Sequence, residues 1–290
     1  MKLTKDTEIL IVGLGVIGGG YARGLTDAGY RVVCITKEQK DVDYAMAQGM
    51  IAEGYTTVEE AVVRRADLVI LALYPTVMLQ WLEDYQDFFK SGAIITDVTG
   101  VKGRIVDQVQ GMLRRDVEFI AAHPMAGRER SGVEYSDAQV FHGANYIITP
   151  TARNTSEAIE LSRELGEILG FARISELDPE THDEMIAFLS QLTHCIAVTL
   201  MNCNTTPNME AYTGDSFRDL TRIAKINDEM WSELFLWNRE ALLRQMDAFA
   251  GTFAEMRYLL KKGDRDGLRE MMRYSTFRRT RFDRPENDET

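Results

Sequence analysis

The first half of the chain alternates between short apolar runs and longer segments whose apolar positions recur with helical spacing. The apolar runs have strand length and lie at residues 8–12, 31–35, 67–73, 93–97, 118–122 and 146–149. Strands that are apolar along most of their length are typical of parallel sheets covered by helices on both faces. Amphipathic segments lie between them at 58–65, 77–89 and 104–113. This alternation predicts an α/β domain with a doubly wound, mostly parallel sheet over residues 1–177.

The pattern changes near residue 178, where strand-like runs give way to helical ones. Residues 185–202 are apolar on almost every side, which predicts a helix buried between others. Further helical patterns lie at 228–250, 252–261 and 266–274. We therefore predict an all-helical C-terminal domain over residues 178–290. Because so apolar a helix is hard for a small domain to cover, it is either the core helix of one chain or part of a homodimer interface.

Composition and charge exclude several classes of protein. The 290 residues include 33 Lys and Arg against 45 Asp and Glu, a net charge of −12, whereas nucleic-acid binding needs a broad basic surface. Three scattered cysteines, Cys34, Cys195 and Cys203, predict neither a disulfide framework nor a metal site. No apolar run approaches the roughly 18 residues of a membrane span. Because Gly13 and Gly15 also interrupt any signal-like segment, we expect a soluble cytoplasmic protein without membrane partners.

A glycine-rich loop follows the first predicted strand directly. It fits the pattern GxGxxG and consists of Gly13, Leu14, Gly15, Val16, Ile17 and Gly18. A strand before the loop, a helix after it and a second strand about a dozen residues further on give this pattern its meaning. The first glycine permits a tight turn, the second lets a pyrophosphate approach the backbone, and the third lets helix and strand pack closely. The loop therefore predicts a Rossmann-like domain that binds a dinucleotide at a helix N-terminus.

The end of the second predicted strand bears on which dinucleotide is bound. An acidic residue usually stands there when the ligand is NAD, because its carboxylate binds the ribose 2′-hydroxyl. This chain has Thr36 and Lys37 instead, and a hydroxyl and an ammonium group suit the 2′-phosphate of NADP. Glu38 follows directly, so NAD remains an alternative, and Lys37 is otherwise a solvated surface charge. We predict NADP before NAD.

One of the four histidines stands where ligands bind in open α/β sheets. His123 follows the predicted strand at 118–122, and the carboxyl ends of strands form the ligand-binding edge. Imidazole titrates near neutral pH, so a histidine there can accept a proton from an alcohol while a hydride leaves the same carbon. The alternative is a structural histidine fixed by Pro124. Together with the glycine loop, His123 predicts an oxidoreductase.

Several motifs occur in an order that resembles one enzyme family. They are the glycine loop, ITDVTGVKG at 95–103, AAHPMAGRERSGVE at 121–134, HDEMIAFLSQLTH at 182–194 and FRDLTRIAKINDEMWSELFLWNREALL at 217–243. From about residue 8 to residue 260 the sequence is similar to prephenate/arogenate (cyclohexadienyl) dehydrogenases of tyrosine biosynthesis. The resemblance implies a Rossmann-like domain followed by a helical dimerisation domain, and therefore a homodimer. It also implies an NAD(P)-dependent oxidative decarboxylation of a small dicarboxylate.

The resemblance also assigns roles to individual residues. It implies that His123 accepts the proton of the ring hydroxyl and that His194 lies near substrate and nicotinamide, although a core histidine is the alternative for His194. Arg222 matches an arginine that holds a substrate carboxylate, and two parallel hydrogen bonds from a guanidinium suit that task. Its alternative is an ion pair with Asp219 at helical spacing.

Two more arginines and two departures from the family pattern complete the candidate site. Arg128 and Arg130 follow His123 and face the second carboxylate, the cofactor phosphates or solvent. Gly100 stands where the family commonly has a serine, so the hydrogen bond of that serine is missing or comes from Thr99 or water. Thr193 replaces the usual proline before His194.

Three alternatives for the function remain open from the sequence. Prephenate and arogenate differ in one keto or amino group, and no residue identified here distinguishes them. A different Rossmann-like oxidoreductase, such as a hydroxyacid or imine reductase, would share the glycine loop but has no use for the His123 motif. A binding protein without turnover would need neither a base nor a carboxylate-binding arginine.

Overall fold

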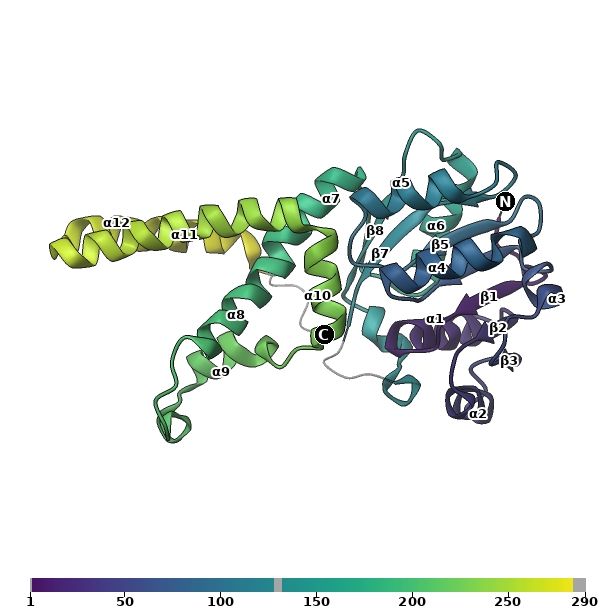
Figure 1. Cartoon of the computed structure of the whole chain (residues 1–290), viewed down its shortest axis with the longest axis horizontal. Coiled ribbons are helices and arrows are strands. Elements are labelled where there is room, and N and C mark those ends of the chain that lie inside the picture. Colours follow the sequence, from purple (N-terminus) through teal and green to yellow (C-terminus); the bar gives the residue numbers. More distant parts are fainter. Residues whose placement is uncertain (1, 128–131, 284–290) are drawn as a thin grey trace. The chain divides into compact units, whose positions relative to one another are not determined.

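The computed structural model describes residues 2–127 and 132–283. Its main sheet consists of six parallel strands in the order β3-β2-β1-β4-β5-β6 (Figure 1). The strands are β1 (Ile9–Val12), β2 (Val32–Ile35), β3 (Glu53–Tyr55), β4 (Leu68–Leu71), β5 (Ile94–Asp97) and β6 (Glu118–Phe119). The predicted doubly wound parallel sheet is confirmed, although the short, half-buried β3 lies outside the predicted apolar runs.

Both faces of this sheet are covered by helices, which explains why β1, β2 and β4 are apolar throughout. Ile9 and Ile11 of β1 face a core built with α1 (Val16–Asp27), α2 (Gln39–Ala47) and α6 (Ser156–Ile168). Leu10 and Val12 face the other core, built with α3 (Glu60–Val63), α4 (Pro75–Tyr85) and α5 (Gly103–Met112). Successive side chains of a strand point to opposite faces, so each strand needs apolar residues at every position.

A second, smaller sheet corrects one predicted strand. It consists of β7 (Ala121–Met125), β8 (Asn145–Thr149) and β9 (Arg173–Glu176), with β7 antiparallel and β9 parallel to β8. The run predicted as one strand at 118–122 is divided at Ile120 between β6 of the main sheet and β7 of the small one. Apolar periodicity cannot reveal this division because both halves are buried. His123 consequently lies within β7, not after the end of a strand.

Every described element after β9 is helical, as the resemblance implied. These helices are α7 (Pro179–Ile186), a π-helical turn at Ala187–Gln191, α8 (Leu192–Asn202), α9 (Asp215–Thr221), α10 (Asp228–Trp237), α11 (Arg239–Lys262) and α12 (Arg265–Arg279). Short 3-10 turns occur at Gln86–Phe88, Val133–Tyr135, Ala138–Phe141, Met209–Tyr212, Arg222–Ala224 and Thr280–Phe282. The helix predicted at 228–250 is interrupted at Asn238, between α10 and α11.

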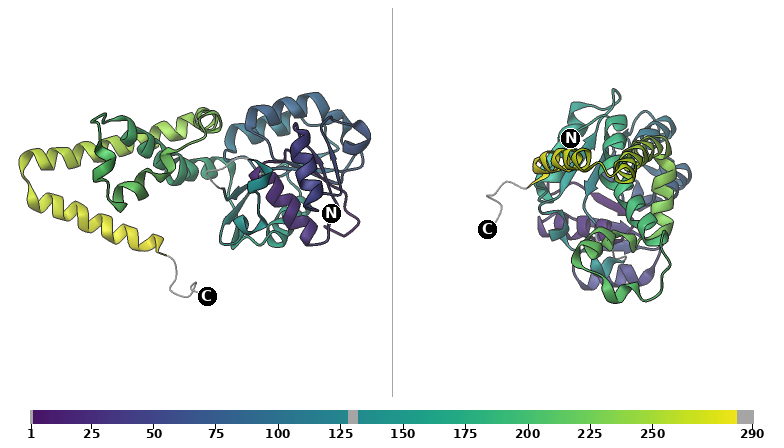
Figure 2. Two further views of the ribbon diagram at one scale, coloured as in Figure 1. Left: turned by 90° about the horizontal axis from the view of Figure 1, so that it is seen from below. Right: turned by 90° about the vertical axis from the view of Figure 1, so that its left-hand side faces the viewer.

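Two compact units divide the chain, residues 1–239 and residues 240–290. This division does not test the predicted boundary between residues 177 and 178, which stays a prediction. In the second unit, α11 and α12 are joined at Gly263, whose φ of +66° favours glycine. The Asp264 side chain caps α12 by accepting from Gly267 N, and Figure 2 shows the two helices diverging from this turn.

Residues 179–202 form one continuous helical stretch that corrects two expectations. Its apolar side chains Met185, Phe188, Leu189 and Met201 are 40–48% exposed, so within one chain the segment is not a helix buried on all sides. The stretch is also long and apolar enough to cross a membrane by length and composition, contrary to the expectation from the sequence. That criterion alone is weak, because the core or interface helix of a soluble protein meets it too. His182, Asp183 and Gln191 are buried here and hydrogen-bonded to other elements, which is typical of packing against protein.

Candidate active site

The register of the main sheet brings four strand ends to one edge. Val12 pairs with Ile35 and with Leu71, and Leu71 pairs with Asp97, so β1, β2, β4 and β5 end side by side. The strand order reverses direction between β1 and β4, and ligands of open α/β sheets bind outside the carboxyl ends at such a point. The glycine loop, Thr36 and the loop after Asp97 therefore meet at the expected edge.

The glycine loop has the geometry of a phosphate-binding turn. Gly13 has a φ of +96°, and a Cβ there would overlap the carbonyl oxygen of Ala72. A Cβ on Gly18 would overlap the carbonyl oxygen of Gly13, so this glycine permits close packing of helix and loop. Gly15 is the N-cap of α1, and a Cβ there would meet no described atom within 4 Å. The open space at the N-terminus of a 12-residue helix fits a bound pyrophosphate.

The other five residues assigned to the cofactor belong to this turn or follow β2, which ends beside it. Leu14 is buried in the core, and Val16 and Ile17 begin α1, so these three contribute backbone more than side chain. Thr36 follows the end of β2, where its N–H donates to the carbonyl oxygen of Tyr55. Lys37 is exposed beside it. Both side chains stand at the place where the 2′ position of an adenosine ribose is bound in this fold.

His123 is joined to a chain of hydrogen bonds that the sequence analysis did not identify. Its Nδ1 lies 2.9 Å from Nε2 of His182, and Nδ1 of His182 lies 2.8 Å from Oδ1 of Asp183. The Asp183 carboxylate also accepts from the backbone N–H groups of Lys102 and Gly103, each at 2.8 Å. His182 and Asp183 are the first two residues of the motif at 182–194, so the sequence did contain a signal for them. Their spacing along the chain, however, gave no indication that they contact His123.

A buried ion pair between Asp97 and Lys102 also lies next to His123. Nζ of Lys102 lies 2.6 Å from Oδ2 of Asp97, and both side chains are fully buried. Oδ1 of Asp97 accepts from Ala122 N, next to His123, at 3.1 Å. The hydroxyl of Thr99 contacts Asp97 and accepts from Lys102 Nζ at 3.2 Å. We call Asp97, Thr99, Lys102, His123, His182 and Asp183 the His123 corner.

Electrostatics in the His123 corner favour neutral imidazoles. Burial holds the pKa of His123 well below its ordinary value, and neighbouring His182 and Lys102 lower it further. Burial also lowers the pKa of His182, although Asp183 opposes this effect. His123 is therefore unprotonated at pH 7, as a general base must be.

Gly100 lies against the ring nitrogen of His123 that does not contact His182. A Cβ at position 100 would lie 3.6 Å from Nε2 of His123 and 3.8 Å from Leu234 of α10. The serine common at this position in the resembling family would thus face this nitrogen. Thr99 does not replace it, because the contacts of its buried hydroxyl are with Asp97, Lys102 and the carbonyl oxygen of Val101. Substrate binding by Thr99 stays a prediction that these contacts do not support.

His194 and Arg222 lie on helical elements around α10. The His194 ring stacks on Trp231 of α10, with centroids 3.7 Å apart and an interplanar angle of 29°. Its Nδ1 lies 2.9 Å from the carbonyl oxygen of Ser190. Leu234, which faces Gly100, follows Trp231 on the same helix, so α10 connects the surroundings of both histidines. Arg222 is exposed on a 3-10 turn that packs against α8.

The remaining two predicted substrate residues, Arg128 and Arg130, lie outside the described residues. Trp231, which stacks on His194, is a further candidate that the sequence analysis did not identify. It stands in the motif at 217–243, but an aromatic residue on an amphipathic helix is by itself typical of a core.

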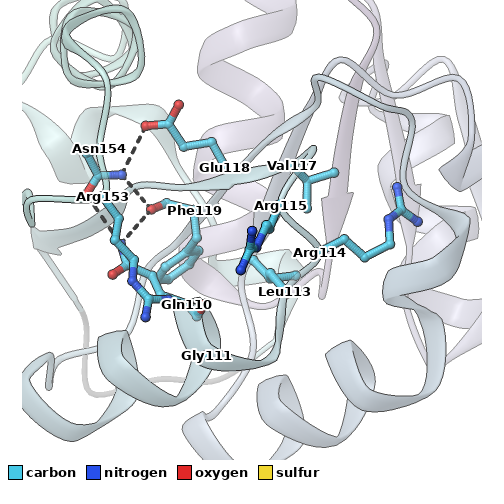
Figure 3. Close-up of a pocket in the computed structure, with 10 residues that line it drawn as sticks. All are labelled: Gln110, Gly111, Leu113, Arg114, Arg115, Val117, Glu118, Phe119, Arg153 and Asn154. Carbon is cyan, nitrogen blue, oxygen red and sulfur yellow. Dashed lines mark hydrogen bonds between the residues drawn. The ribbon is translucent and has the colours of Figure 1, made fainter.

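A pocket of about 530 Å³ lies away from all of these residues (Figure 3). It is bounded by the end of α5, the start of β6 and the loop before α6, with lining residues that include Arg114, Arg115 and Arg153. Arg114 donates to the carbonyl oxygen of Phe89 at 2.9 Å, and Arg153 donates to that of Gln110. Figure 3 shows Arg114 extending away from Arg153. These two arginines hold loops together at the amino-terminal edge of β6, so the pocket is no candidate for the oxidoreductase site.

The chain resembles known proteins both in sequence and in fold. The family description "Prephenate dehydrogenase, nucleotide-binding domain" matches residues 21–174, and "Prephenate dehydrogenase, dimerization domain" matches residues 178–274. The chain is 31% identical over 271 residues to a prephenate dehydrogenase of Lactococcus lactis, which covers 90% of this chain and 73% of the relative. It is also 31% identical over 283 residues to a cyclohexadienyl dehydrogenase of Zymomonas mobilis, covering 94% and 95%. A crystal structure of prephenate dehydrogenase from A. aeolicus with hydroxyphenyl propionate and NAD+ is 28% identical, with a TM-score of 0.89 over 98% of this chain and 100% of that one.

Proposed function

The chain belongs to the prephenate dehydrogenase family, and on that premise we propose that it oxidatively decarboxylates prephenate to 4-hydroxyphenylpyruvate with His123 as the general base. Membership across both halves of the chain removes the alternative of an unrelated hydroxyacid or imine reductase. Arogenate, which would give tyrosine by the same chemistry, remains the second candidate substrate. The reaction belongs to tyrosine biosynthesis, and a cytoplasmic location stays a prediction.

The observation that carries the proposal is the orientation of His123. Its Nδ1 is engaged by His182 at 2.9 Å, while its Nε2 lies on the side of Gly100, where a Cβ would be 3.6 Å away. A partly exposed, unprotonated imidazole with one nitrogen directed away from its protein partner is suited to accept a proton from a ligand. Gly100, which lies against His123, follows β5, one of the strands that end at the same edge as β1 and its glycine loop.

The chemistry divides between the base and the cofactor. His123 takes the proton of the ring hydroxyl as the hydroxyl-bearing carbon becomes a carbonyl carbon. A bound nicotinamide dinucleotide supplies the acceptor for the hydride that leaves this carbon. The bond from the opposite ring carbon to its carboxylate breaks, CO₂ departs, and the bonding electrons complete the aromatic ring, so the carbonyl oxygen becomes a phenolate that takes up a proton. Aromatisation makes the step irreversible.

Positive and aromatic groups are proposed to hold the substrate. Arg222 binds one carboxylate of the substrate, since a guanidinium offers two parallel donors. His194, stacked on Trp231, lies near the ring of the substrate and the nicotinamide. Arg128 and Arg130 are proposed for the second carboxylate or the cofactor phosphates. Local cations thus attract anionic ligands to a chain whose net charge is −12.

NADP is the proposed cofactor. Thr36 and Lys37 follow β2, and a hydroxyl with an ammonium group suits a 2′-phosphate. NAD remains possible in chemical terms because Glu38, the N-cap of α2, offers a carboxylate one residue further on.

We further propose a homodimer that uses the helical part of the chain. On α11, Met246, Phe249, Phe253 and Leu260 recur with helical spacing and are 38–61% exposed; we call them the hairpin face. Contiguous exposed apolar side chains mark interaction surfaces. The match of residues 178–274 to a dimerization domain indicates that the partner is a second copy of the chain.

A two-by-two assay tests the proposed function. Prephenate and arogenate are each combined with NADP and NAD, and reduced nicotinamide is followed by absorbance. We expect turnover with prephenate and the highest kcat/KM with NADP. His123→Asn should lower kcat by about 10²- to 10⁴-fold, because general base catalysis contributes that much, while cofactor affinity stays unchanged.

Each outcome of this assay has a distinct meaning. Turnover with arogenate alone would replace the substrate, and a preference for NAD would remove the role of Lys37. Absence of turnover in all four combinations would contradict the enzyme proposal. Near-normal kcat in His123→Asn would leave His123 with a structural role.

A further inference from the structure

His182 and Asp183 stand behind the proposed base and have no role in the function proposed above. Asp183 is fixed first, because each of its carboxylate oxygens accepts a backbone N–H at 2.8 Å, Oδ1 from Lys102 and Oδ2 from Gly103. These groups belong to the start of α5, whose N-cap Lys102 makes no side-chain capping bond. Asp183 on α7 therefore caps α5 from another helix, where the helix dipole favours its negative charge.

The fixed carboxylate determines the tautomer of His182. An ionised carboxylate only accepts hydrogen bonds, so Nδ1 of His182, 2.8 Å from Oδ1 of Asp183, carries the proton. His182 is completely buried, and burial lowers its pKa, so the ring is neutral at pH 7. A neutral imidazole with a protonated Nδ1 has a lone pair on Nε2, which is the atom that faces His123.

The tautomer of His123 follows by the same reasoning. Its Nδ1 lies 2.9 Å from the lone pair of His182 Nε2, so His123 donates the proton of its Nδ1. Its own Nε2 must then carry the lone pair, directed to the side where Gly100 leaves space. The other tautomer would place two lone pairs against each other and leave the proton on the nitrogen that has to accept one.

We propose that His182 and Asp183 are positioning residues that hold His123 in the tautomer with a basic Nε2. The inference rests on the proposed function of His123. After His123 accepts a proton, its Nδ1–H becomes a charge-assisted donor to His182, which stabilises the imidazolium. Asp183 and Asp97 raise the pKa of the accepting His182, whereas Lys102 lowers the pKa of both histidines.

A structural role is the competing explanation, since Asp183 also caps α5 and His182 fills space in the core. Two substitutions at His182 distinguish these explanations. His182→Phe keeps the volume and removes both hydrogen bonds. His182→Gln places an amide oxygen near the former Nε2, where it can again accept from His123.

The experiment measures kcat, KM and the thermal midpoint of three variants with the substrate that the wild type uses. His182→Phe should lower kcat by about 10- to 10²-fold, with KM and cofactor affinity nearly unchanged, because a misplaced tautomer impairs proton transfer and not binding. His182→Gln should recover most of this loss. Asn238→Leu is the matched control, since buried Asn238 donates to the backbone oxygen of Asp183 at 2.9 Å without touching the two histidines. It should lower the thermal midpoint and leave kcat within about 2-fold.

The outcomes separate this inference from the proposed function. If the wild type turns over neither substrate, the function proposed for His123 fails and the inference fails with it. If the wild type is active and His182→Phe keeps its kcat, the positioning role alone is wrong. An equal loss of kcat in His182→Phe, His182→Gln and Asn238→Leu would also overturn it, because helix α7 would then act only as a support. If His182→Phe does not fold, His182→Gln decides, since an inactive but folded Gln variant contradicts the rescue.

Discussion

In the His123 corner five of six polar or charged side chains are buried, whereas the four apolar side chains of the hairpin face are 38–61% exposed. Each region thus departs from the usual distribution of side chains, and in opposite directions. Buried polar groups and clustered exposed apolar groups are informative for this reason, since each costs free energy unless something compensates it.

The compensation differs between the two regions. In the His123 corner it lies within the chain: Asp97 pairs with Lys102, and Asp183 accepts two backbone N–H groups. At the hairpin face the apolar side chains stay 38–61% exposed among the described residues, and we propose that a second copy of the chain covers them. The buried polar groups of the His123 corner are therefore compensated within one chain, whereas we propose that the hairpin face is compensated by a partner chain. The following predictions test this difference.

The largest effect is expected for Lys102→Met. Removing one partner of a fully buried pair leaves the Asp97 carboxylate uncompensated, so the free energy of unfolding should fall by about 3–5 kcal/mol. Chemical denaturation with urea measures the loss. The matched control is Arg64→Met, which breaks the exposed pair of Arg64 with Glu60 and should cost less than about 0.5 kcal/mol.

A double variant and a pH profile test the reason for this loss. Asp97→Asn combined with Lys102→Met removes both charges and should cost less than Lys102→Met alone. Lys102 lowers the pKa of His123, so its removal raises that pKa. Activity needs unprotonated His123, and acidification should therefore abolish activity at a higher pH in Lys102→Met than in the wild type. If Lys102→Met and Arg64→Met had the same free energy of unfolding, the Asp97–Lys102 pair would not be what compensates the buried charge of the His123 corner.

Much of the fold was predictable because a strand that is buried on both faces of a sheet appears in the sequence as a continuous apolar run. The strands β1, β2, β4 and β5 match apolar runs, and the glycine loop has the turn, the open position and the close packing that its three glycines predicted. The failures have physical causes too. β9 is short, with polar residues at its ends, so it leaves no apolar run. The division at Ile120 separates two buried strands of different sheets, and periodicity carries no information about sheet membership.

In the candidate site, the sequence could indicate a residue whose side chain and position along the chain both suggest a chemical role. His123 follows an apolar strand run, at the kind of position where ligands bind in open α/β sheets, so it was a candidate without any known partner. His182 and Asp183 could not be identified in this way. Their proposed role depends on contacts with β7 and with the start of α5, which lie 59 and 81 residues away in the sequence. Tertiary hydrogen bonds of this kind have no local sequence signature.

Phe253→Lys should weaken the homodimer by about 10²-fold. Phe253 is 61% exposed in the single chain, and each of two symmetric copies would lose roughly 1.5 kcal/mol of burial in a shared interface. Sedimentation velocity over a range of protein concentrations measures the change. Met46→Lys is the control, since Met46 is an exposed apolar residue on α2, and it should leave the dimer intact. A wild type that sediments as a monomer would contradict the role given to the hairpin face.

The smallest effect is expected at Gly100, which lies beside the His123 corner. Gly100→Ser adds a Cβ 3.6 Å from Nε2 of His123 and 3.8 Å from Leu234, both ordinary contact distances. Its hydroxyl is placed to share a hydrogen bond with the substrate hydroxyl that His123 deprotonates. One net hydrogen bond contributes about 0.5–1.5 kcal/mol, so kcat/KM should rise by about 2- to 10-fold.

Gly100→Ala separates the hydroxyl from the added volume. It brings the same Cβ without a donor, so kcat/KM should stay at or below the wild-type value, and steady-state kinetics with prephenate measures both variants. A gain in Gly100→Ser alone would mean that the compensation within the His123 corner is one hydrogen bond short of complete. Identical kinetics for Ser and Ala would instead place the substrate hydroxyl away from position 100, and the proton would then reach Nε2 from another direction.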